Sequence, residues 1–176
     1  MKKTFLICSL PRSRTAWISN FLTYGPSFCF HEPFVNVVPQ DMKYRFELMP
    51  HDYLGIADSL CTLFIEDLLK IFPESKIVVI RRPVEEVIRR FSEMGLHTGD
   101  FLLRMDGQLS AVQNQYDPLV IDYHKFNPGL IWEYLIPEVP LSKSRMHMLE
   151  NFNITVPLET TLMKGFEFIK QQIAGR

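Results

Sequence analysis

Short apolar runs along the chain predict a set of β-strands. They cover residues 4–9, 27–31, 76–81 and 119–123. Residues 4–9 and 76–81 are continuously apolar in the middle, without the alternation of a half-exposed strand. Such runs are typical of central parallel strands that are buried on both faces.

Stretches with apolar residues at helical spacing separate these runs. They predict helices at residues 58–72, 83–94, 101–115, 129–135, 142–151 and 158–173. Pro73 ends the first helix, and Pro83 fits the first position of the second. Alternating strands and helices predict a single α/β domain over residues 1–176, with three layers and a mostly parallel central sheet flanked by helices. In such sheets ligands bind outside the carboxyl ends of the strands.

Composition limits the partners that the chain can have. It has 176 residues, 22% of them charged, and a net charge of −1. No global field attracts nucleic acid or an anionic membrane, so any anion site must be local. The apolar run after Lys3 is broken by Pro11 and is too short for a leader or a membrane span.

The three cysteines indicate neither a disulfide framework nor a metal site. Cys8 and Cys29 lie inside strand-like runs, where inert core thiols are expected. No spacing of Cys and His resembles a zinc site, and we expect no metal. A reducing, cytoplasmic setting is therefore expected.

The turn after the first strand is the strongest chemical signal. Residues 9–15 hold Arg12 and Arg14 together with hydroxyl side chains, and a helix follows. The free N–H groups at a helix start bind anions, so the turn predicts a phosphate or sulfate site. The alternative is a turn whose arginines are merely solvated. The turn has no glycine and no lysine, so it is not a Walker A loop.

The turn resembles the phosphosulfate-binding loop of the sulfotransferases, which bind 3'-phosphoadenosine 5'-phosphosulfate (PAPS) on a P-loop-like α/β fold. The family loop typically reads Pro-(Lys/Arg)-Ser-Gly-Thr-(Thr/Ser)-(Trp/Leu). The matching residues are Pro11, Arg12, Ser13, Arg14, Thr15, Ala16 and Trp17. Arg14 replaces the glycine and Ala16 replaces a hydroxyl residue. The resemblance implies a PAPS site made by these seven residues.

A second segment, residues 76–91, resembles the family's 3'-phosphate site, Arg-(Asp/Asn)-Pro-x-(Asp/Glu)-x-x-x-Ser. Arg81, Pro83 and Glu85 match it, Arg82 replaces the acidic or amide residue, and Arg89 replaces the serine. Arginine binds phosphate bidentately, so the resemblance implies that Arg81 and Arg89 hold the 3'-phosphate.

Part of this segment also has an ordinary interpretation. Glu85 and Glu86 each precede an arginine, Arg89 and Arg90, by four residues. Such pairs are common on the solvated face of a helix.

A third segment, His31-Glu32-Pro33, supplies a candidate base. Several sulfotransferases have Glu-Pro here, and the resemblance implies that Glu32 takes the proton from the acceptor. His31 has the better intrinsic pKa for that work near neutral pH. The alternatives are a capping or ion-pairing role for Glu32, for instance with Arg12, and a structural role for His31.

These motifs imply an enzyme that transfers a sulfuryl group from PAPS to a hydroxyl or amine of a small molecule or carbohydrate. Arg12 would neutralise charge on the transferred group. One alternative is a P-loop kinase with Asp122 as its acid, and another is a nucleotide-binding relative that has lost transfer. Residues 36–58 are expected to form the wall of the acceptor pocket, through residues that include Tyr44, Arg45, His51, Asp52 and Tyr53.

Overall fold

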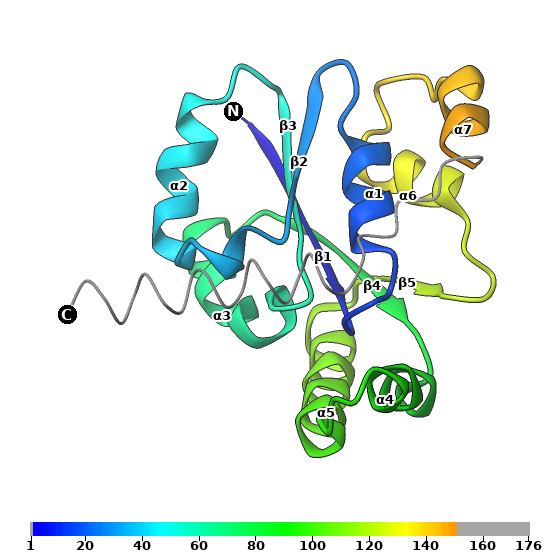
Figure 1. Cartoon of the computed structure of the whole chain (residues 1–176). Helices are drawn as coiled ribbons and strands as arrows, with labels where there is room; N and C mark the ends of the chain where they lie inside the picture. Colours follow the sequence, from blue (N-terminus) through cyan, green and yellow to red (C-terminus); the bar gives the residue numbers. More distant parts are fainter. Residues whose placement is uncertain (1, 151–176) are drawn as a thin grey trace.

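In a computed structural model, which describes residues 2–150, five parallel strands form one central sheet (Figure 1). The strands lie in the order β2-β3-β1-β4-β5. Their bounds are β1 Lys3–Ser9, β2 Ser27–His31, β3 Tyr53–Ala57, β4 Lys76–Arg81 and β5 Leu119–Asp122. The predicted α/β class is confirmed, and every strand pair in this sheet is parallel.

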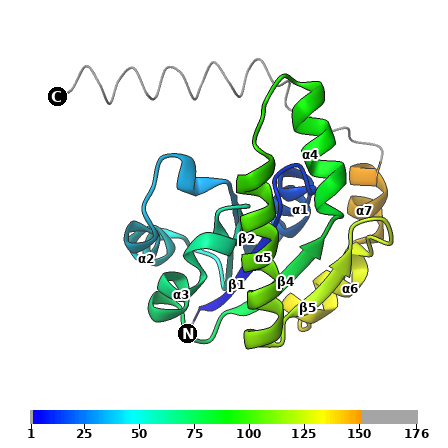
Figure 2. The ribbon, with the colours of Figure 1, turned by 90° about the horizontal axis from the view of Figure 1, so that it is seen from below.

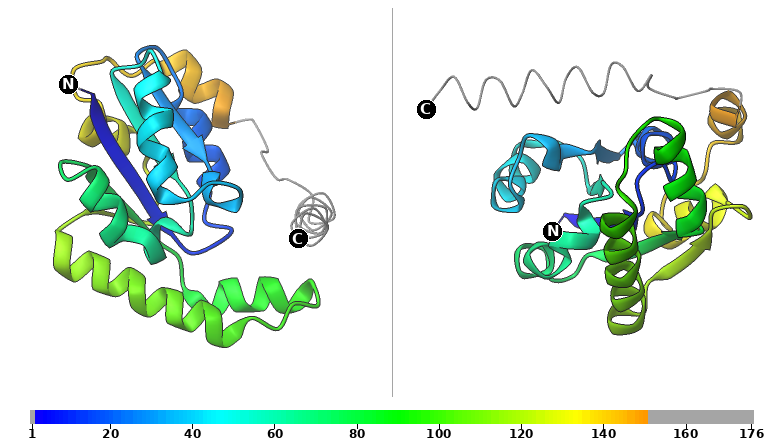
Figure 3. Two further views of the ribbon diagram at one scale, coloured as in Figure 1. Left: turned by 90° about the vertical axis from the view of Figure 1, so that its left-hand side faces the viewer. Right: turned by 60° about the horizontal axis from the view of Figure 1, so that its bottom comes forward.

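Helices cover both faces of the sheet. The elements are α1 Thr15–Leu22, η1 Pro33–Val35, α2 Pro39–Leu48, α3 Cys61–Ile71, α4 Val84–Glu93, α5 Gly99–Tyr116, α6 Pro128–Leu135 and α7 Lys143–Glu150. Helices α2, α3, α4 and α5 pack on one face, and α1, α6 and α7 pack on the other (Figures 2 and 3). The helix predicted at 158–173 lies outside the described residues. Within those residues, no helix is long and apolar enough to span a bilayer.

Side-chain alternation along β1 divides the core in two. Leu6 and Cys8 pack with the helices of the first face, whereas Phe5 and Ile7 pack with those of the second. All four are buried, as the continuous apolar run predicts for a central strand.

Besides the short 3-10 helix η1, two elements were not predicted, α2 and β3, and both fall within residues 36–58. Tyr53, at the start of β3, pairs with Lys3 of β1 and Ser27 of β2 at the amino edge of the sheet. His51 and Asp52 precede it. The expectation that these three residues wall an acceptor pocket is wrong, because such a pocket would lie at the carboxyl edge.

The anion loop, residues 9–15, leaves β1 at a point where the topology changes direction. The chain passes from β1 to β2 by way of α1 on one face, and from β4 to β5 by way of α4 and α5 on the other. Connections that diverge in this way leave a crevice at the carboxyl ends of the strands. The fold thus places the anion loop where ligands of parallel sheets bind.

Candidate active site

The anion loop has an unusual backbone. Arg12 and Arg14 both adopt left-handed conformations, with φ of 63° and 69°. Glycine occupies this region readily, whereas other residues do so at a cost in energy. Arg14 stands where the sulfotransferase loop has glycine, so the structure gives a conformational reason for the family's residue.

The loop presents hydrogen-bonding groups that lack partners within residues 2–150. The hydroxyls of Ser9 and Ser13 are fully buried and form no hydrogen bond there. Buried hydroxyls are rarely left unpaired, which marks the loop as a place for a polar ligand. The first N–H groups of α1 also have no partner inside the helix. The exposed Arg12 side chain adds a positive charge.

Arg14 does not extend freely into solvent. Its guanidinium stacks 4.9 Å from the ring centroid of Tyr123 and 5.0 Å from that of Phe126. These cation–π contacts hold the side chain beside the loop. Trp17 packs edge-on against Phe126 and donates from Nε1 to the carbonyl of Leu149 at 3.0 Å. Sequence reasoning did not find Tyr123 or Phe126, because both lie more than a hundred residues from Arg14 along the chain.

Pro11 and Ala16 are the other two residues of the predicted PAPS loop, and they flank residues 12–15. Pro11 is half-buried ahead of Arg12, and Ala16 is half-buried in the first turn of α1. The Ala16 carbonyl accepts bonds from Ser19 Oγ and Asn20 Nδ2, both at 2.9 Å. Neither residue offers the loop a charged side chain, so their contribution to a ligand would be through the backbone.

The structure brings both candidate bases to the loop. The Thr15 hydroxyl donates to Glu32 Oε1 at 3.2 Å and lies 3.5 Å from His31 Nε2. His31 Nε2 and Glu32 Oε1 are themselves 3.6 Å apart. Glu32 has a left-handed backbone, with φ of 43°, as the chain turns from β2 into η1. Three polar groups, from α1, from the end of β2 and from the turn that follows it, therefore meet at the carboxyl edge.

Asp58 fixes the segment that carries Glu32. It is buried at the end of β3 and accepts the N–H groups of Phe34, at 3.0 Å, and Leu60, at 2.8 Å. Burial raises the pKa of Asp58 above its ordinary value, and the two N–H donors counteract this in part. The strand before Asp58 was not recognised in the sequence, so its place at this edge was not predicted.

Arg81 and Arg89, the predicted 3'-phosphate pair, do not share a partner within the described part of the chain. Arg81 Nη2 pairs with Asp106 Oδ1 of α5 at 3.1 Å, and its Nη1 donates to Ser110 at 3.4 Å. Arg89 is exposed on α4 and lies 3.9 Å from Glu93. Arg81 is the last residue of β4 and Arg89 lies on the helix that follows, but within the described residues neither forms a hydrogen bond with the anion loop.

Arg82, rather than Arg81, contacts the anion loop. Its Nη1 donates to the carbonyl of Arg12 at 2.7 Å. The expected pairing of Glu86 with Arg90 is not found, because Glu86 binds Arg82 Nε at 3.3 Å and His124 Nε2 at 2.8 Å. Arg90 pairs with Glu93 instead. Alternation at the strand end sends the two adjacent arginines to opposite layers.

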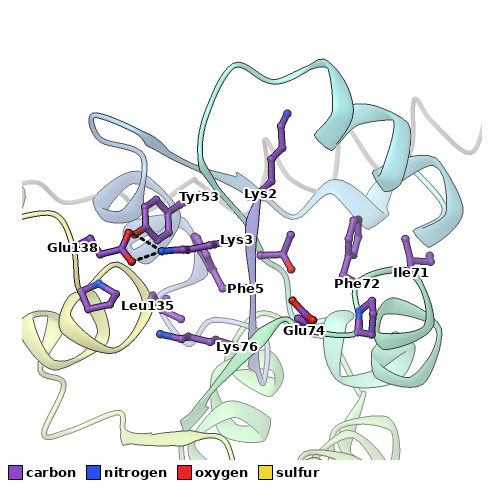
Figure 4. Close-up of a pocket in the computed structure, with 13 residues that line it drawn as sticks. Lys2, Lys3, Phe5, Tyr53, Ile71, Phe72, Glu74, Lys76, Leu135 and Glu138 are labelled. Carbon is purple, nitrogen blue, oxygen red and sulfur yellow. Dashed lines mark hydrogen bonds and ion pairs between the residues drawn. The ribbon is translucent and has the colours of Figure 1, made fainter.

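A cavity of about 600 Å³ opens at the other edge of the sheet, beside the amino ends of β1, β3 and β4 (Figure 4). Phe5, Phe72 and Leu135 line its apolar part. On its polar side Tyr53 donates to Glu138 at 2.7 Å, and Lys3 also binds Glu138. These polar groups satisfy one another, and the cavity is remote from the anion loop.

The three cysteines are free and buried. Burial raises the pKa of Cys8 to about 12 and raises that of Cys29 as well. Both thiols are thus protonated at neutral pH, as expected for the inert core thiols that the sequence indicates.

Comparison with known families agrees with this architecture. The family described as "Sulfotransferase domain" matches residues 25–128, which is more than half of the chain. The protein belongs to this family, whose chemistry is the transfer of sulfuryl groups. The match includes His31, Glu32, Arg81 and Arg89, and it begins after the anion loop. A search of curated proteins finds no match.

Proposed function

We propose that the protein transfers a sulfuryl group from PAPS to a hydroxyl or amine of a small molecule or carbohydrate. One observation carries the proposal: Thr15, at the start of the helix that follows the anion loop, hydrogen-bonds Glu32 Oε1 at 3.2 Å. A group that binds the donor and a group that accepts a proton are therefore adjacent. Transfer of this kind needs positioning and electrostatic stabilisation more than covalent help from the protein.

The residues of the loop suit the donor. The unpaired hydroxyls of Ser9 and Ser13 and the free N–H groups of α1 can hold the 5'-phosphate side of PAPS. Arg12, exposed beside them, can neutralise charge on the transferred group and on the departing phosphate. PAPS, when bound, supplies the sulfuryl group. Glu32 takes the acceptor's proton, with His31 as the competing candidate.

The 3'-phosphate is proposed to bind at Arg81, with Arg89 as a second contact. Arg81 is the better placed of the two, because it is held at the end of β4 by Asp106 and Ser110. The Asp106 carboxylate partly neutralises that guanidinium, so a 3'-phosphate must compete with it. Arg81→Ala is expected to abolish the preference for adenosine 3',5'-bisphosphate over AMP, and Arg89→Ala is expected to reduce it less. Equal affinities of the wild-type protein for the two nucleotides would contradict the proposal that these arginines bind the 3'-phosphate.

The central experiment measures binding first and transfer second. Isothermal calorimetry with adenosine 3',5'-bisphosphate, without magnesium, should show binding that Arg12→Ala weakens by about tenfold or more. Its matched control is Arg104→Ala, at an exposed arginine of α5. Transfer of labelled sulfate from PAPS to a panel of phenols, alcohols, amines and sugars then tests activity.

The two alternatives give different results in the same assays. A kinase would bind ATP with magnesium in preference to the bisphosphate. Its expected acid, Asp122, accepts the N–H groups of His124 and Lys125 at 2.7 and 3.4 Å, which is a turn-forming role. A relative that has lost catalysis would bind the bisphosphate and transfer nothing to any acceptor.

A further inference from the structure

We propose that Arg82 is a positioning residue that holds the anion loop in its binding conformation. The proposal about the loop stands on geometry alone. Its consequence for catalysis rests on the proposed function.

The first observation is a bond between elements far apart in the sequence. Arg82 Nη1 donates to the carbonyl oxygen of Arg12 at 2.7 Å, across 70 positions. The Arg82 side chain is only 10% exposed. The bond lies at the surface, beside the exposed Arg12, but a charged donor forms a stronger bond to a carbonyl than a neutral donor does.

The guanidinium is itself held on its other sides. Arg82 Nε lies 3.3 Å from Glu86 Oε2, and the guanidinium stacks 4.3 Å from the ring centroid of Tyr123. His124 Nε2 binds the second oxygen of Glu86 at 2.8 Å. Tyr123 thus has Arg82 and Arg14 within cation–π distance, so α4 and the segment that follows β5 together support the loop.

The loop needs support of this kind because of its backbone. Arg12 and Arg14 both have positive φ without being glycine, and such conformations persist only where their surroundings impose them. The Arg12 carbonyl shares a planar trans peptide with the N–H of Ser13. A bond that fixes the direction of the carbonyl therefore also fixes the direction of that N–H. Without Arg82, this peptide is free to rotate and the loop loses a defined set of donors.

Arg82 acts through Arg12 and not as a ligand. Its Nη1 and Nε donate to Arg12 and Glu86, and Tyr123 lies against the face of its guanidinium. Arg12, in contrast, is exposed and forms no side-chain bond within residues 2–150. The structure therefore divides the labour between an arginine that can meet the anion and one that shapes the loop.

The test combines two measurements on the full chain. Hydrogen exchange of peptides covering residues 9–16 reports on the loop without any ligand. Calorimetry with adenosine 3',5'-bisphosphate reports on the binding site. The variants are Arg82→Ala, Arg82→Lys and the control Arg90→Ala, an exposed arginine of α4 that pairs with Glu93. Thermal unfolding shows that each variant is folded.

Arg82→Ala should speed hydrogen exchange in the loop by about tenfold or more, and it should weaken the binding of adenosine 3',5'-bisphosphate by a similar factor. Arg90→Ala should leave both the exchange rate of the loop and the affinity for the bisphosphate within about twofold of wild type. Arg82→Lys keeps the charge but cannot reproduce the planar fork and the stack, so it should resemble alanine in both measurements. Full restoration by lysine would mean that charge alone matters and would overturn the proposal.

The two proposals fail in different ways. Unchanged loop exchange in Arg82→Ala would overturn the positioning role, whatever the protein binds. Faster loop exchange, in a protein whose wild type binds no bisphosphate, would support the positioning role and contradict the proposed function. Were Arg82→Ala to fail to fold, the milder variant Glu86→Gln, which removes the carboxylate that orients Arg82, should speed loop exchange in the same direction.

Discussion

Thr15 and Glu32 meet at the carboxyl edge of the sheet, where the Thr15 hydroxyl donates to the Glu32 carboxylate at 3.2 Å. Thr15 begins the helix that follows the anion loop, and Glu32 begins the turn that follows β2. The hydrogen bond connects the predicted donor site with the predicted base. His31 approaches the same hydroxyl at 3.5 Å, so the geometry offers two candidates for one proton.

Glu32→Gln is expected to lower the rate of sulfuryl transfer by about 10²–10⁴-fold, because a carboxamide cannot take the proton from the acceptor. Affinity for adenosine 3',5'-bisphosphate should stay within about twofold of wild type. The comparison variant is His31→Gln, which should change the rate far less. A reversal of the two effects, measured as kcat in labelled-sulfate transfer, would assign the base to His31.

Arg14 allows the left-handed backbone of the loop to be tested directly. Arg14→Ala and Arg14→Gly both remove the stack on Tyr123 and Phe126, but only glycine adopts φ of 69° without a Cβ penalty. The glycine variant should be more stable than the alanine variant by about 1 kcal/mol.

The control for Arg14 is the same pair of substitutions at Arg104, inside α5. There the order should reverse, because glycine is the weaker helix former by about 1 kcal/mol. Urea unfolding gives both differences. If the alanine variant were more stable than the glycine variant at Arg14 as well as at Arg104, the left-handed conformation of Arg14 would be contradicted.

Asp58 predicts a pH dependence of stability. Its pKa is raised in the folded protein, mainly by burial, so the unfolded chain gives up this proton at a lower pH than the folded one. Between the ordinary aspartate pKa, about 3.9, and the raised one, the folded state binds more protons. The free energy of unfolding contributed by Asp58 therefore falls as pH rises through this window.

Asp58→Asn removes that contribution, although the amide oxygen can accept the N–H of only one of Phe34 and Leu60 well. The variant should be less stable than wild type, and the difference should narrow as pH rises through the window. Urea unfolding across the acid range measures both. A difference that stays constant or widens would show that the Asp58 pKa is not raised.

Gly55 provides a prediction about the core of the sheet. A Cβ at this position would lie 1.8 Å from Cε2 of the Phe5 ring, which is buried against β3. Gly55→Ala should therefore lower stability by about 1–3 kcal/mol. At Gly107, in α5, no atom stands within 4 Å of the added carbon, and alanine should raise stability by about 0.5–1 kcal/mol. Calorimetric melting distinguishes the two, and equal effects would contradict the Phe5 packing.

The apolar runs were sufficient to predict four of the strands, the central strands β1 and β4 and the edge strands β2 and β5, because each has a nearly unbroken series of apolar residues. The strand Tyr53–Ala57 is central and buried along its whole length, but it was missed because it contains Gly55 and follows polar residues. Helix α2 was missed for a related reason: its buried residues are few, Pro39, Met42 and Phe46, among charged neighbours.

The loop and its candidate bases could be predicted because the relevant residues are contiguous in the sequence. The directions of Arg81 and Arg82 could not. Both follow the same apolar run, and only the register of β4 against β1 and β5 decides which arginine faces α5 and which faces the loop. The contacts of Arg14 with Tyr123 and Phe126 depend on the same tertiary placement.

The two tryptophans give the molecule an optical readout. Trp17 lies close after the anion loop and touches Phe126, on which Arg14 also stacks, whereas Trp132 is fully buried beneath α1 and bonded to the carbonyl of Val139. Emission from the first should respond when the loop changes, and emission from the second should remain a steady background. Occupancy of the site could thus be followed in real time, without any added dye, by intrinsic fluorescence.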